Sequence, residues 1–324
     1  MTDKKNSRDN DFFGIRGNSK VLNDVFTKIE QVAPEDVTVL IIGESGVGKE
    51  LVARAIHRLS QRADGPFLPV NMGAMATEIA SSEIFGHEKG AFTGASESRE
   101  GLFTAANDGT LFLDEVGSMD HKTQTALLRI LENRVFRKVG GKKTHETNAR
   151  IIAANDRDLR QDVKEKKFRR DLLYRLEVFT IHVPPLRDRP EDIPILVDGF
   201  MKQFNHEMEK EDICHITDAA LDCLLQYRWP GNVRELKNVI QSAMLLITDQ
   251  NSITPDHLPA RLKADDGKAR VSGIPPGLSL KDVEKIYITQ TLRLTEGNKS
   301  AAAKSLGVSR RYLYNKIEEY DISV

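Results

Sequence analysis

VTVLIIGESGVGKE, residues 37–50, decides the fold of this chain. Its apolar first half predicts a buried strand, and a helical pattern follows the GxxxxGK spacing. That spacing between a strand and a helix indicates a P-loop, where backbone N–H groups converge on phosphate oxygens at a helix N-terminus. Lys49 adds a point charge for the β and γ phosphates. The predicted nucleotide-binding residues are Gly43, Glu44, Ser45, Gly46, Val47, Gly48, Lys49 and Glu50.

An acidic pair completes this chemistry. A short apolar strand ends in Asp114 and Glu115, about 65 residues after the P-loop. Position 50 is Glu instead of the Ser or Thr that usually contacts magnesium, so Asp114 is the expected Mg²⁺ ligand and Glu115 the group that polarises the attacking water. Asn155, at the end of a later strand, is a candidate sensor of the γ phosphate. Together these residues predict ATP hydrolysis.

Apolar runs divide the chain into units. Five short runs, separated by helix-length segments, predict a parallel sheet with helices on both faces. They lie at residues 37–42, 67–70, 110–113, 150–154 and 178–183. Residues 190–260 show helical patterns only. We expect a disordered tail at 1–13, an α/β subdomain at 14–183, a helical subdomain at 184–260, a Gly- and Pro-containing linker at 261–277, and a helical domain at 278–324.

Composition excludes several classes of protein. The 324 residues carry 47 Lys and Arg against 48 Asp and Glu, a net charge of −1, so the chain as a whole has no electrostatic reason to bind nucleic acid. No apolar stretch approaches the roughly 20 residues that span a bilayer, and no secretory segment begins the sequence. Two cysteines are too few for a disulfide framework. We therefore expect a cytoplasmic protein without a membrane partner.

The C-terminal end departs from this balanced charge. Residues 298–317 hold five basic side chains and no acidic one. Helical segments at 299–306 and 309–320, separated by Gly307, predict a helix-turn-helix whose second helix enters the major groove of double-stranded DNA. Taken alone, such a run is equally well explained as a solvated face. The candidate DNA contacts are Lys299, Lys304, Ser309, Arg310, Arg311, Tyr312, Asn315 and Lys316.

Residues 85–95, FGHEKGAFTGA, carry a family resemblance. With the P-loop and the acidic pair, this segment resembles the bacterial enhancer-binding proteins, the AAA+ ATPases that activate sigma-54-dependent transcription. The resemblance runs from about Gly14 to the C-terminus. It implies an AAA+ α/β core, an α-helical lid and a Fis-type helix-turn-helix. It also implies a protein that binds upstream enhancer DNA and uses ATP to remodel the closed complex of sigma-54 RNA polymerase holoenzyme into an open complex.

The GAFTGA loop is the element that the resemblance assigns to sigma-54. Its glycines and alanines allow sharp bending around one aromatic ring. From the residues alone, Phe92 would be assigned to the core, because phenylalanine is usually buried. The resemblance instead places Phe92 at the apex of a moving loop. The implied sigma-54 contacts are Gly90, Ala91, Phe92, Thr93, Gly94 and Ala95.

The resemblance extends to further positions. It implies that Asn71 restrains Glu115, that Arg169 and Arg175 act as arginine fingers across a subunit boundary, and that Arg234 is a second sensor. Without it, the basic cluster around Arg169 is a solvated face. Fingers supplied in trans imply a homo-oligomer, and a head-to-tail contact generates a ring if the rotation closes. The resemblance implies six subunits, and the sequence leaves seven open. The helix expected at residues 279–295 implies a dimer that reads an inverted repeat.

One question stays open at this level, and two alternative functions are weighed against the motifs. Only about 13 residues precede Gly14, so either a partner protein regulates the chain in trans or the chain is a truncation. A DNA-binding regulator without remodelling activity would predict a damaged GAFTGA loop or missing arginine fingers, whereas both are intact. A general AAA+ remodelling chaperone would predict no sequence-specific DNA reader, which the last 48 residues contradict.

Overall fold

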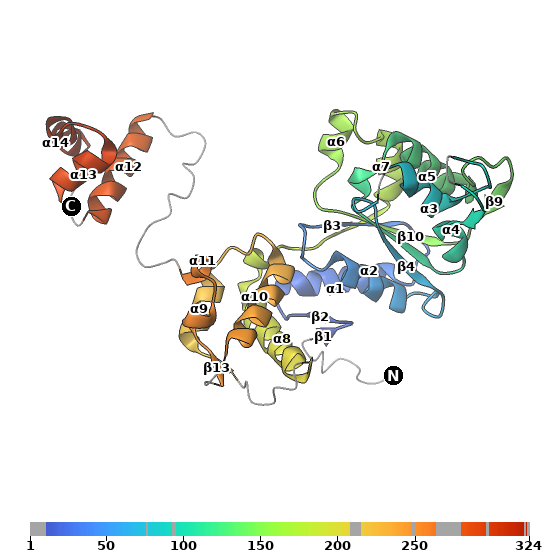
Figure 1. Cartoon of the computed structure of the whole chain (residues 1–324), viewed down its shortest axis with the longest axis horizontal. Coiled ribbons are helices and arrows are strands. Elements are labelled where there is room, and N and C mark those ends of the chain that lie inside the picture. The colour runs from blue at the N-terminus through green and yellow to red at the C-terminus, as the bar shows by residue number, and fades with distance from the viewer. Residues whose placement is uncertain are drawn as a thin grey trace. The chain divides into compact units, whose positions relative to one another are not determined.

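The computed structural model describes residues 11–75, 77–92, 95–207, 215–247, 251–263, 280–295, 298–320 and 322. The chain divides into two compact units, residues 1–258 and residues 259–324. The first unit holds an α/β sheet subdomain followed by a helical one, and the second is a small helical unit (Figure 1). We describe each unit by itself.

A five-stranded parallel sheet forms the centre of the first unit and confirms the predicted fold class. All five apolar runs of the sequence form strands. Their order across the sheet is β11 (Phe179–His182), β3 (Val39–Ile42), β10 (Arg150–Asn155), β7 (Thr110–Asp114) and β4 (Phe67–Asn71). Because the strands are parallel, the P-loop after β3 and the acidic pair at the end of β7 lie at the same edge of the sheet.

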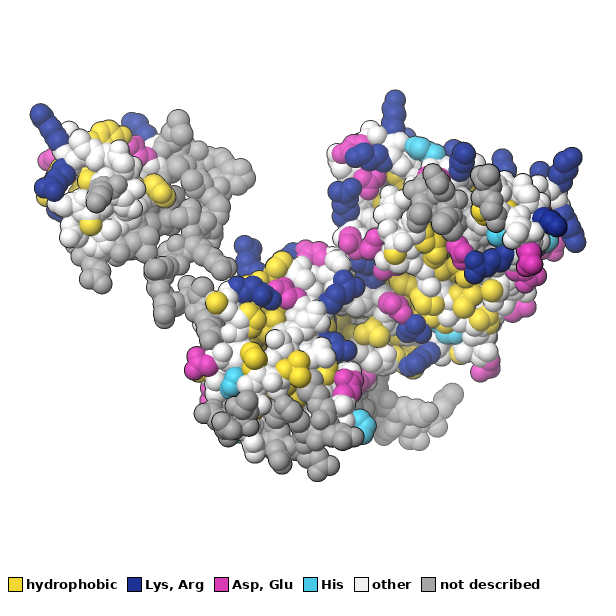
Figure 2. All heavy atoms as spheres, in the orientation of Figure 1, with side chains coloured by type: hydrophobic (Ala, Val, Ile, Leu, Met, Phe, Trp, Pro, Cys, Tyr) yellow, Lys and Arg dark blue, Asp and Glu magenta, His cyan; other side chains and the backbone are white. Residues whose placement is uncertain are grey.

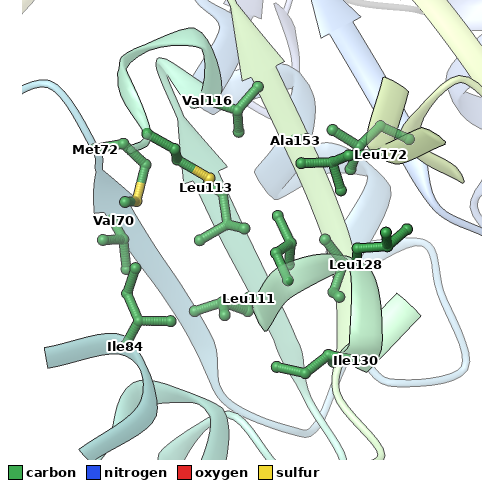
Figure 3. Packing of buried hydrophobic residues seen from close by; sticks show 14 of the residues in the cluster. Val70, Met72, Ile84, Leu111, Leu113, Val116, Leu128, Ile130, Ala153 and Leu172 are labelled. Carbon is green, nitrogen blue, oxygen red and sulfur yellow. The ribbon is translucent and has the colours of Figure 1, made fainter. Parts of the chain in front are cut away.

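Helices cover both faces of this sheet, as Figure 1 shows. One face packs against α1 (Lys20–Val32) and α2 (Lys49–Arg58). On the other face, Leu111 and Leu113 of β7 pack with Leu128 of α5 (Figure 3). The helices on that face are α3 (Thr77–Phe85), α4 (Leu102–Ala105), α5 (His121–Asn133), α6 (Arg160–Lys164) and α7 (Arg170–Leu176).

Side-chain caps fix where several helices begin. The Ser19 hydroxyl accepts from the backbone N–H of Leu22 at the start of α1, and a carboxylate oxygen of Asp120 accepts from Thr123 N at 2.7 Å at the start of α5. Such caps satisfy backbone N–H groups that have no partner within the helix. A short 3₁₀ helix, η1 (Val116–Ser118), connects β7 to α5.

The sequence analysis did not predict three antiparallel strand pairs that the structure contains. They are β1 (Asp11–Phe12) with β2 (Ile15–Arg16), β5 (Gly86–His87) with β6 (Arg99–Glu100), and β8 (Val135–Arg137) with β9 (Thr144–Glu146). The first corrects the predicted boundary of the N-terminal tail. Phe12 stacks on Phe26 of α1 with ring centroids 4.5 Å apart, a contact that local polarity does not reveal. Residues 1–10 of the tail lie outside the described residues.

The helical subdomain follows two 3₁₀ turns, η2 (Leu186–Asp188) and η3 (Pro190–Asp192). Its helices are α8 (Ile193–Glu207), α9 (Asp218–Gln226) and α10 (Asn232–Leu246), close to the predicted bounds. The prediction of helices only is wrong in one respect, because β12 (His215–Ile216) pairs with β13 (Ser252–Ile253). This pairing joins segments far apart in sequence, so no local sequence pattern predicts it. A last 3₁₀ turn, η4 (Pro255–His257), follows.

Helix α11 (Ala260–Lys263) begins the second unit and corrects the predicted linker, which we expected from residue 261. Residues 264–279 lie outside the described residues. The predicted helices then form as α12 (Leu280–Leu294), α13 (Lys299–Leu306) and α14 (Arg310–Glu319). They pack around the fully buried Leu313. Gly307 has φ +68°, a left-handed conformation that glycine adopts without strain, and it makes the turn between α13 and α14.

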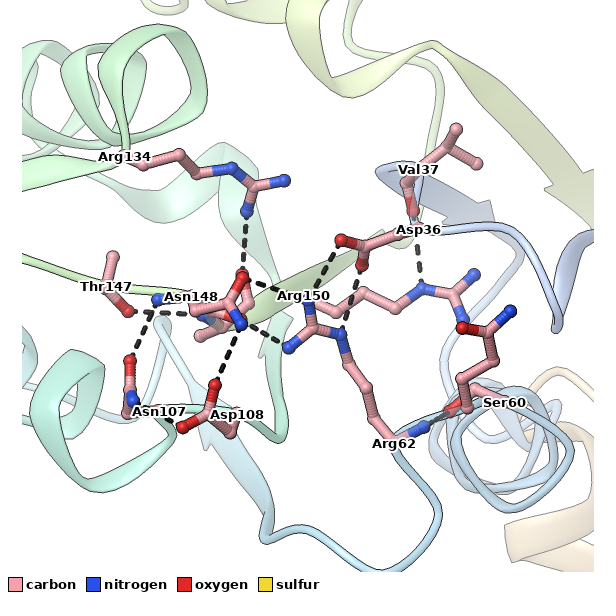
Figure 4. A network of polar contacts seen from close by, with 12 residues as sticks. Asp36, Val37, Ser60, Arg62, Asn107, Asp108, Arg134, Thr147, Asn148 and Arg150 are labelled. Carbon is pink, nitrogen blue, oxygen red and sulfur yellow. Dashed lines mark hydrogen bonds and ion pairs between the residues drawn. The ribbon is translucent and has the colours of Figure 1, made fainter.

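A polar network closes the end of the sheet opposite the P-loop (Figure 4). Buried Arg150, at the start of β10, donates to the carbonyl oxygens of Ala33 at 2.7 Å and Val32 at 2.8 Å. Arg62 binds Asp36 through two nitrogens. These bonds hold the end of α1 and the loops before β3 to the sheet, which leaves the other edge as the place where ligands bind.

Candidate functional site

A pocket of about 520 Å³ lies in the first unit between the sheet edge and the helical subdomain. Its volume falls in the usual range for small-molecule sites. The lining has two chemical characters. Polar side chains include Lys49, Asn71, Asp114, Glu115, Asp156 and Arg234. Apolar side chains include Ile15, Leu22, Val52, Leu196, Phe200 and Val233. A ligand with a charged part and a flat apolar part, such as a nucleotide, fits this arrangement.

The P-loop lines the pocket with its glycines in conformations that other residues rarely adopt. Gly46 has φ +80° and Gly48 has φ +105°. A Cβ atom on Gly46 would lie 2.3 Å from the carbonyl oxygen of Gly231, so only glycine fits against the helical subdomain. Lys49, the first residue of α2, is 6% exposed. Among the sequence-predicted residues, Ser45, Gly46, Val47, Gly48, Lys49 and Glu50 line the pocket.

Asp114 lies at the end of β7, facing Lys49 across the pocket. Burial raises the pKa of this carboxyl above its ordinary value, and the positive charge of Lys49 partly offsets the rise. One oxygen of Asp114 accepts from the backbone N–H of Glu115 at 2.9 Å. A half-buried carboxylate near the P-loop lysine is the kind of oxygen ligand that Mg²⁺ binds. Within the described residues there is no cluster of three or more His, Cys, Asp or Glu side chains that could hold a metal alone.

Glu115 occupies a turn with a left-handed backbone, φ +56°, which is uncommon for a residue with a side chain. Asn71, at the end of the neighbouring strand β4, donates from Nδ2 to Glu115 Oε1 at 3.2 Å. The oxygen of the same amide accepts from Ala74 N at 2.9 Å, which orients it. Gly73 leaves the space that this contact requires, because a Cβ atom there would lie 2.0 Å from Glu115 Oε2.

Asn155 does not face the pocket. Its side-chain oxygen accepts from Gly117 N at 3.0 Å, and its nitrogen donates to the carbonyl of Arg157 at 2.8 Å. Asn155 is 6% exposed and both ends of its amide are engaged, so the structure does not place it as a γ-phosphate sensor. The next residue, Asp156, lines the pocket instead and pairs with Lys49. The sequence analysis did not name Asp156.

Glu44 is turned toward the helical subdomain. Its carboxylate accepts two hydrogen bonds from Arg187, at 2.7 and 2.6 Å, and one from Asn232 at 3.2 Å. The hydrogen bonds from Arg187 lower the pKa of the Glu44 carboxyl. Glu44 does not line the pocket, so its side chain holds the P-loop rather than the ligand. Gly43 likewise lies outside the lining and packs against Val183.

Asn232 connects three segments at the start of α10. It is completely buried and has φ +51°. Its side-chain oxygen accepts from Leu186 N at 2.8 Å, while its nitrogen also donates to Ser45 O at 3.0 Å. Arg234, two residues along, donates to Ser45 Oγ at 3.0 Å. The P-loop is therefore held to α10 by Arg234, which the sequence analysis named as a second sensor, and by Asn232, which it did not name.

Replacing Asn232 by Ala is expected to lower the free energy of unfolding of the first unit by about 1–3 kcal/mol, because Leu186 N and Glu44 lose buried partners. Thermal melting followed by circular dichroism measures the effect as a lower Tm. Asn232→Gly is the matched control for backbone strain, because it removes the same hydrogen bonds while glycine adopts the left-handed conformation without strain. Melting of Asn232→Ala at the native Tm would contradict the connecting role.

Neither candidate arginine finger lines the pocket of its own chain. Arg169 is the N-cap residue of α7 and binds Asp171 through two nitrogens, at 3.0 and 2.7 Å. Arg175, in the last turn of α7, lies 3.6 Å from Glu132. Arg175 is exposed and the Arg169 side chain is 39% exposed, so both can be reached by another molecule.

The GAFTGA loop closes on itself at its base. Gly90 N donates to the carbonyl of Ala95 at 2.9 Å, and Ala95 is buried. Phe92 is 45% exposed, with its ring edge-on to His87 at 5.1 Å. The structure thus contradicts the core assignment that residue type alone favours. Thr93 and Gly94 lie outside the described residues.

The candidate DNA contacts in the second unit fall into two groups. Arg310, Arg311 and Asn315 are exposed on α14, and basic side chains project from this unit in Figure 2. Tyr312 instead donates to Glu284 of α12, and Lys316 lies 3.3 Å from the same carboxylate.

Three candidate DNA contacts remain to be placed. Ser309 caps α14 by accepting from Tyr312 N at 3.2 Å. The Lys299 ammonium lies over the ring of Tyr314, 5.1 Å from its centroid. The side chain of Lys304 lies outside what the structure describes.

Glu284 is the partner that local sequence did not reveal. It accepts from the hydroxyls of Tyr312 at 2.5 Å and Tyr320 at 2.6 Å. These two hydrogen bonds, with a further one from Lys316, lower the pKa of the Glu284 carboxyl to about 2. The network fixes α14 against α12 and engages Tyr312 and Lys316 within the unit.

Among the described helices, none has the length and apolar character that crossing a membrane requires.

Comparison with known proteins agrees with this geometry. Residues 15–182 match the family model of the sigma-54 interaction domain. The chain belongs to the sigma-54 activator family. Residues 187–273 match the AAA+ ATPase lid domain, and residues 279–320 match the bacterial regulatory protein, Fis family. The protein is thus a sigma-54-dependent transcriptional activator with an ATPase domain and a DNA-binding helix-turn-helix domain.

Relatives of this sigma-54 activator span most of its length. It is 45% identical over 306 residues to the transcriptional regulatory protein ZraR of Salmonella typhimurium, covering 94% of this chain and 68% of that protein. It is 45% identical over 313 residues to the regulatory protein AtoC of Escherichia coli, covering 95% and 68%. The crystal structure of NtrX from Brucella abortus in complex with ATP superposes with a TM-score of 0.71 at 36% identity, covering 94% of this chain and 69% of that one. The family assignment supports ATP binding by this chain.

Proposed function

We propose that this activator binds enhancer DNA upstream of its promoters, assembles into a ring and uses ATP hydrolysis to convert the closed complex of sigma-54 RNA polymerase into an open complex. The observation that carries the proposal is the half-exposed Phe92, in the segment between β5 and β6 on the same subdomain as the pocket. A change at the pocket can reach that loop through the sheet and the helices packed on it.

In the proposed mechanism, Lys49 binds the β and γ phosphates. Asp114 would hold Mg²⁺, which when bound would neutralise phosphate charge. Glu115 accepts a proton from the attacking water as the water oxygen bonds to the γ phosphorus. The bond between the γ phosphorus and the bridging oxygen breaks, leaving ADP and phosphate. Asn71 keeps Glu115 turned aside through the 3.2 Å hydrogen bond until the ring engages its target. Arg234 connects the P-loop to α10 through Ser45.

We propose that Arg169 and Arg175 complete the site of a neighbouring subunit, since both reach solvent and lie outside their own pocket. A head-to-tail contact of this kind closes into a ring, for which six subunits is our expectation. Exposed Arg310 and Asn315 would read base edges in the major groove. Tyr287 of α12 is 50% exposed, and α12 would pair two copies on an inverted repeat.

Replacing Thr93 by Ala tests the coupling. We expect the variant to hydrolyse ATP at close to the native rate but to form no open complexes, because the loop transmits work without taking part in the chemistry. Permanganate footprinting of a supercoiled sigma-54 promoter measures melting, and an enhancer footprint verifies that DNA binding persists. Native levels of promoter melting by Thr93→Ala would refute the assignment of the loop.

A further inference from the structure

In this structure the Lys49 ammonium forms an ion pair with a carboxylate of the same chain. It donates to Gly43 O at 2.8 Å and to Glu44 O at 3.4 Å, and it pairs with a carboxylate oxygen of Asp156. An ammonium has three protons, so these three acceptors engage all of them. Lys49 is 6% exposed, whereas the Asp156 side chain is 44% exposed. The carboxylate therefore reaches into the pocket from its open side.

Binding of a phosphate oxygen to Lys49 requires that one of these partners leave. The two carbonyls belong to the P-loop backbone, which Asn232 and Arg187 hold in place. Asp156 is the partner on a rotatable side chain, and it is the anionic one. A carboxylate and a phosphate oxygen compete for the same ammonium and repel each other.

We propose that Asp156 is a positioning residue that acts as an intramolecular competitor of the nucleotide phosphates. When the pocket holds no phosphate, its carboxylate keeps Lys49 charge-paired and directed into the site. On binding, the β and γ phosphates take its place on Lys49 and Asp156 turns toward solvent. The cost of this exchange lowers nucleotide affinity and favours release of the product ADP. The inference rests on the phosphate-binding role of Lys49.

Replacing Asp156 by Asn tests the competition. The amide keeps the shape and an acceptor for Lys49 but removes the negative charge. We expect the dissociation constants of fluorescent ATP and ADP to fall on the order of tenfold, and that of AMP, which lacks both phosphates that Lys49 serves, to stay unchanged. The matched control is Asp158→Asn, because Asp158 is paired with Arg160 and lies outside the pocket lining.

Measurement in EDTA as well as in Mg²⁺ separates competition from metal binding. Competition for Lys49 needs no metal, so tighter ATP binding is expected in both solutions. Weaker binding of Asp156→Asn in Mg²⁺ alone would show that Asp156 supports the metal, and it would overturn the proposal. An unchanged ATP affinity, or an equal gain for AMP, would overturn it too.

Two further variants keep the result interpretable. Asp156→Ser removes the charge with a smaller side chain and should repeat the gain, and thermal melting verifies that both variants fold. Lys49→Ala should lose ATP binding. If instead it binds ATP normally, the P-loop assignment itself fails, an outcome that differs from a native affinity in Asp156→Asn alone.

Discussion

Glu115→Gln is expected to bind ATP as the native protein does and to hydrolyse it about 10²–10⁴-fold more slowly. The amide has the shape of the carboxylate but accepts no proton from the attacking water. Glu115 already lines the pocket beside Asp114, on a left-handed turn that fixes its direction. Single-turnover phosphate release measures the rate, and fluorescent ATP measures binding.

The control for this variant is Glu165→Gln, which removes a carboxylate paired with Lys167 outside the pocket. It should turn over ATP at the native rate. Because Asn71 contacts Glu115, Asn71→Ala in the otherwise native protein should change the rate of ATP hydrolysis without changing the affinity for ATP. Native turnover by Glu115→Gln would remove Glu115 from the mechanism.

Arg169→Ala is expected to bind nucleotide normally and to lower hydrolysis in assembled rings by about 10³–10⁵-fold, the range for a lost arginine finger. In this structure Arg169 is bound to Asp171, and it has to leave that carboxylate to reach a neighbour's γ phosphate. ATPase assays at concentrations that permit assembly measure the effect. Arg170→Ala, which removes the adjacent exposed arginine, should retain activity.

Mixed rings decide whether the finger acts in trans. A subunit with Arg169→Ala has an intact pocket, and a subunit with Glu115→Gln has an intact finger. Mixing the two inactive variants should restore a fraction of the native ATPase rate, because some interfaces combine the intact pocket with the intact finger. If the mixture stays inactive although both variants assemble, Arg169 serves its own subunit or no site at all.

The sequence predicted the sheet and the P-loop because both are encoded by neighbouring residues. Each buried parallel strand is a continuous apolar run, and the P-loop works through consecutive backbone N–H groups. Asp114 and Glu115 could be predicted for the same reason, since a carboxylate at the end of a buried strand lies at the edge of the sheet where ligands bind. The outward-facing position of Arg310 was predicted from helical periodicity.

The direction of individual side chains was not encoded locally. Asn155 and Asp156 are adjacent polar residues at the end of β10, and either one fits the sequence pattern. The Asn155 amide accepts a hydrogen bond from Gly117 N and donates one to the carbonyl of Arg157, so Asp156 is the residue at the pocket. Tyr312 was expected on the DNA-reading face, but Glu284 on α12 holds its hydroxyl. Partners distant in sequence decide these directions.

By itself, the sequence determined which chemistry this activator carries: a phosphate loop, a strand-end acidic pair, a GAFTGA loop and a basic helix-turn-helix. Only the tertiary structure decided which side chains meet. It set Glu44 against Arg187 instead of a nucleotide, Glu115 against Asn71, and Lys49 against Asp156. The reason is physical: residue type and spacing fix local backbone geometry and charge, whereas pairing depends on segments that folding alone brings within hydrogen-bond distance.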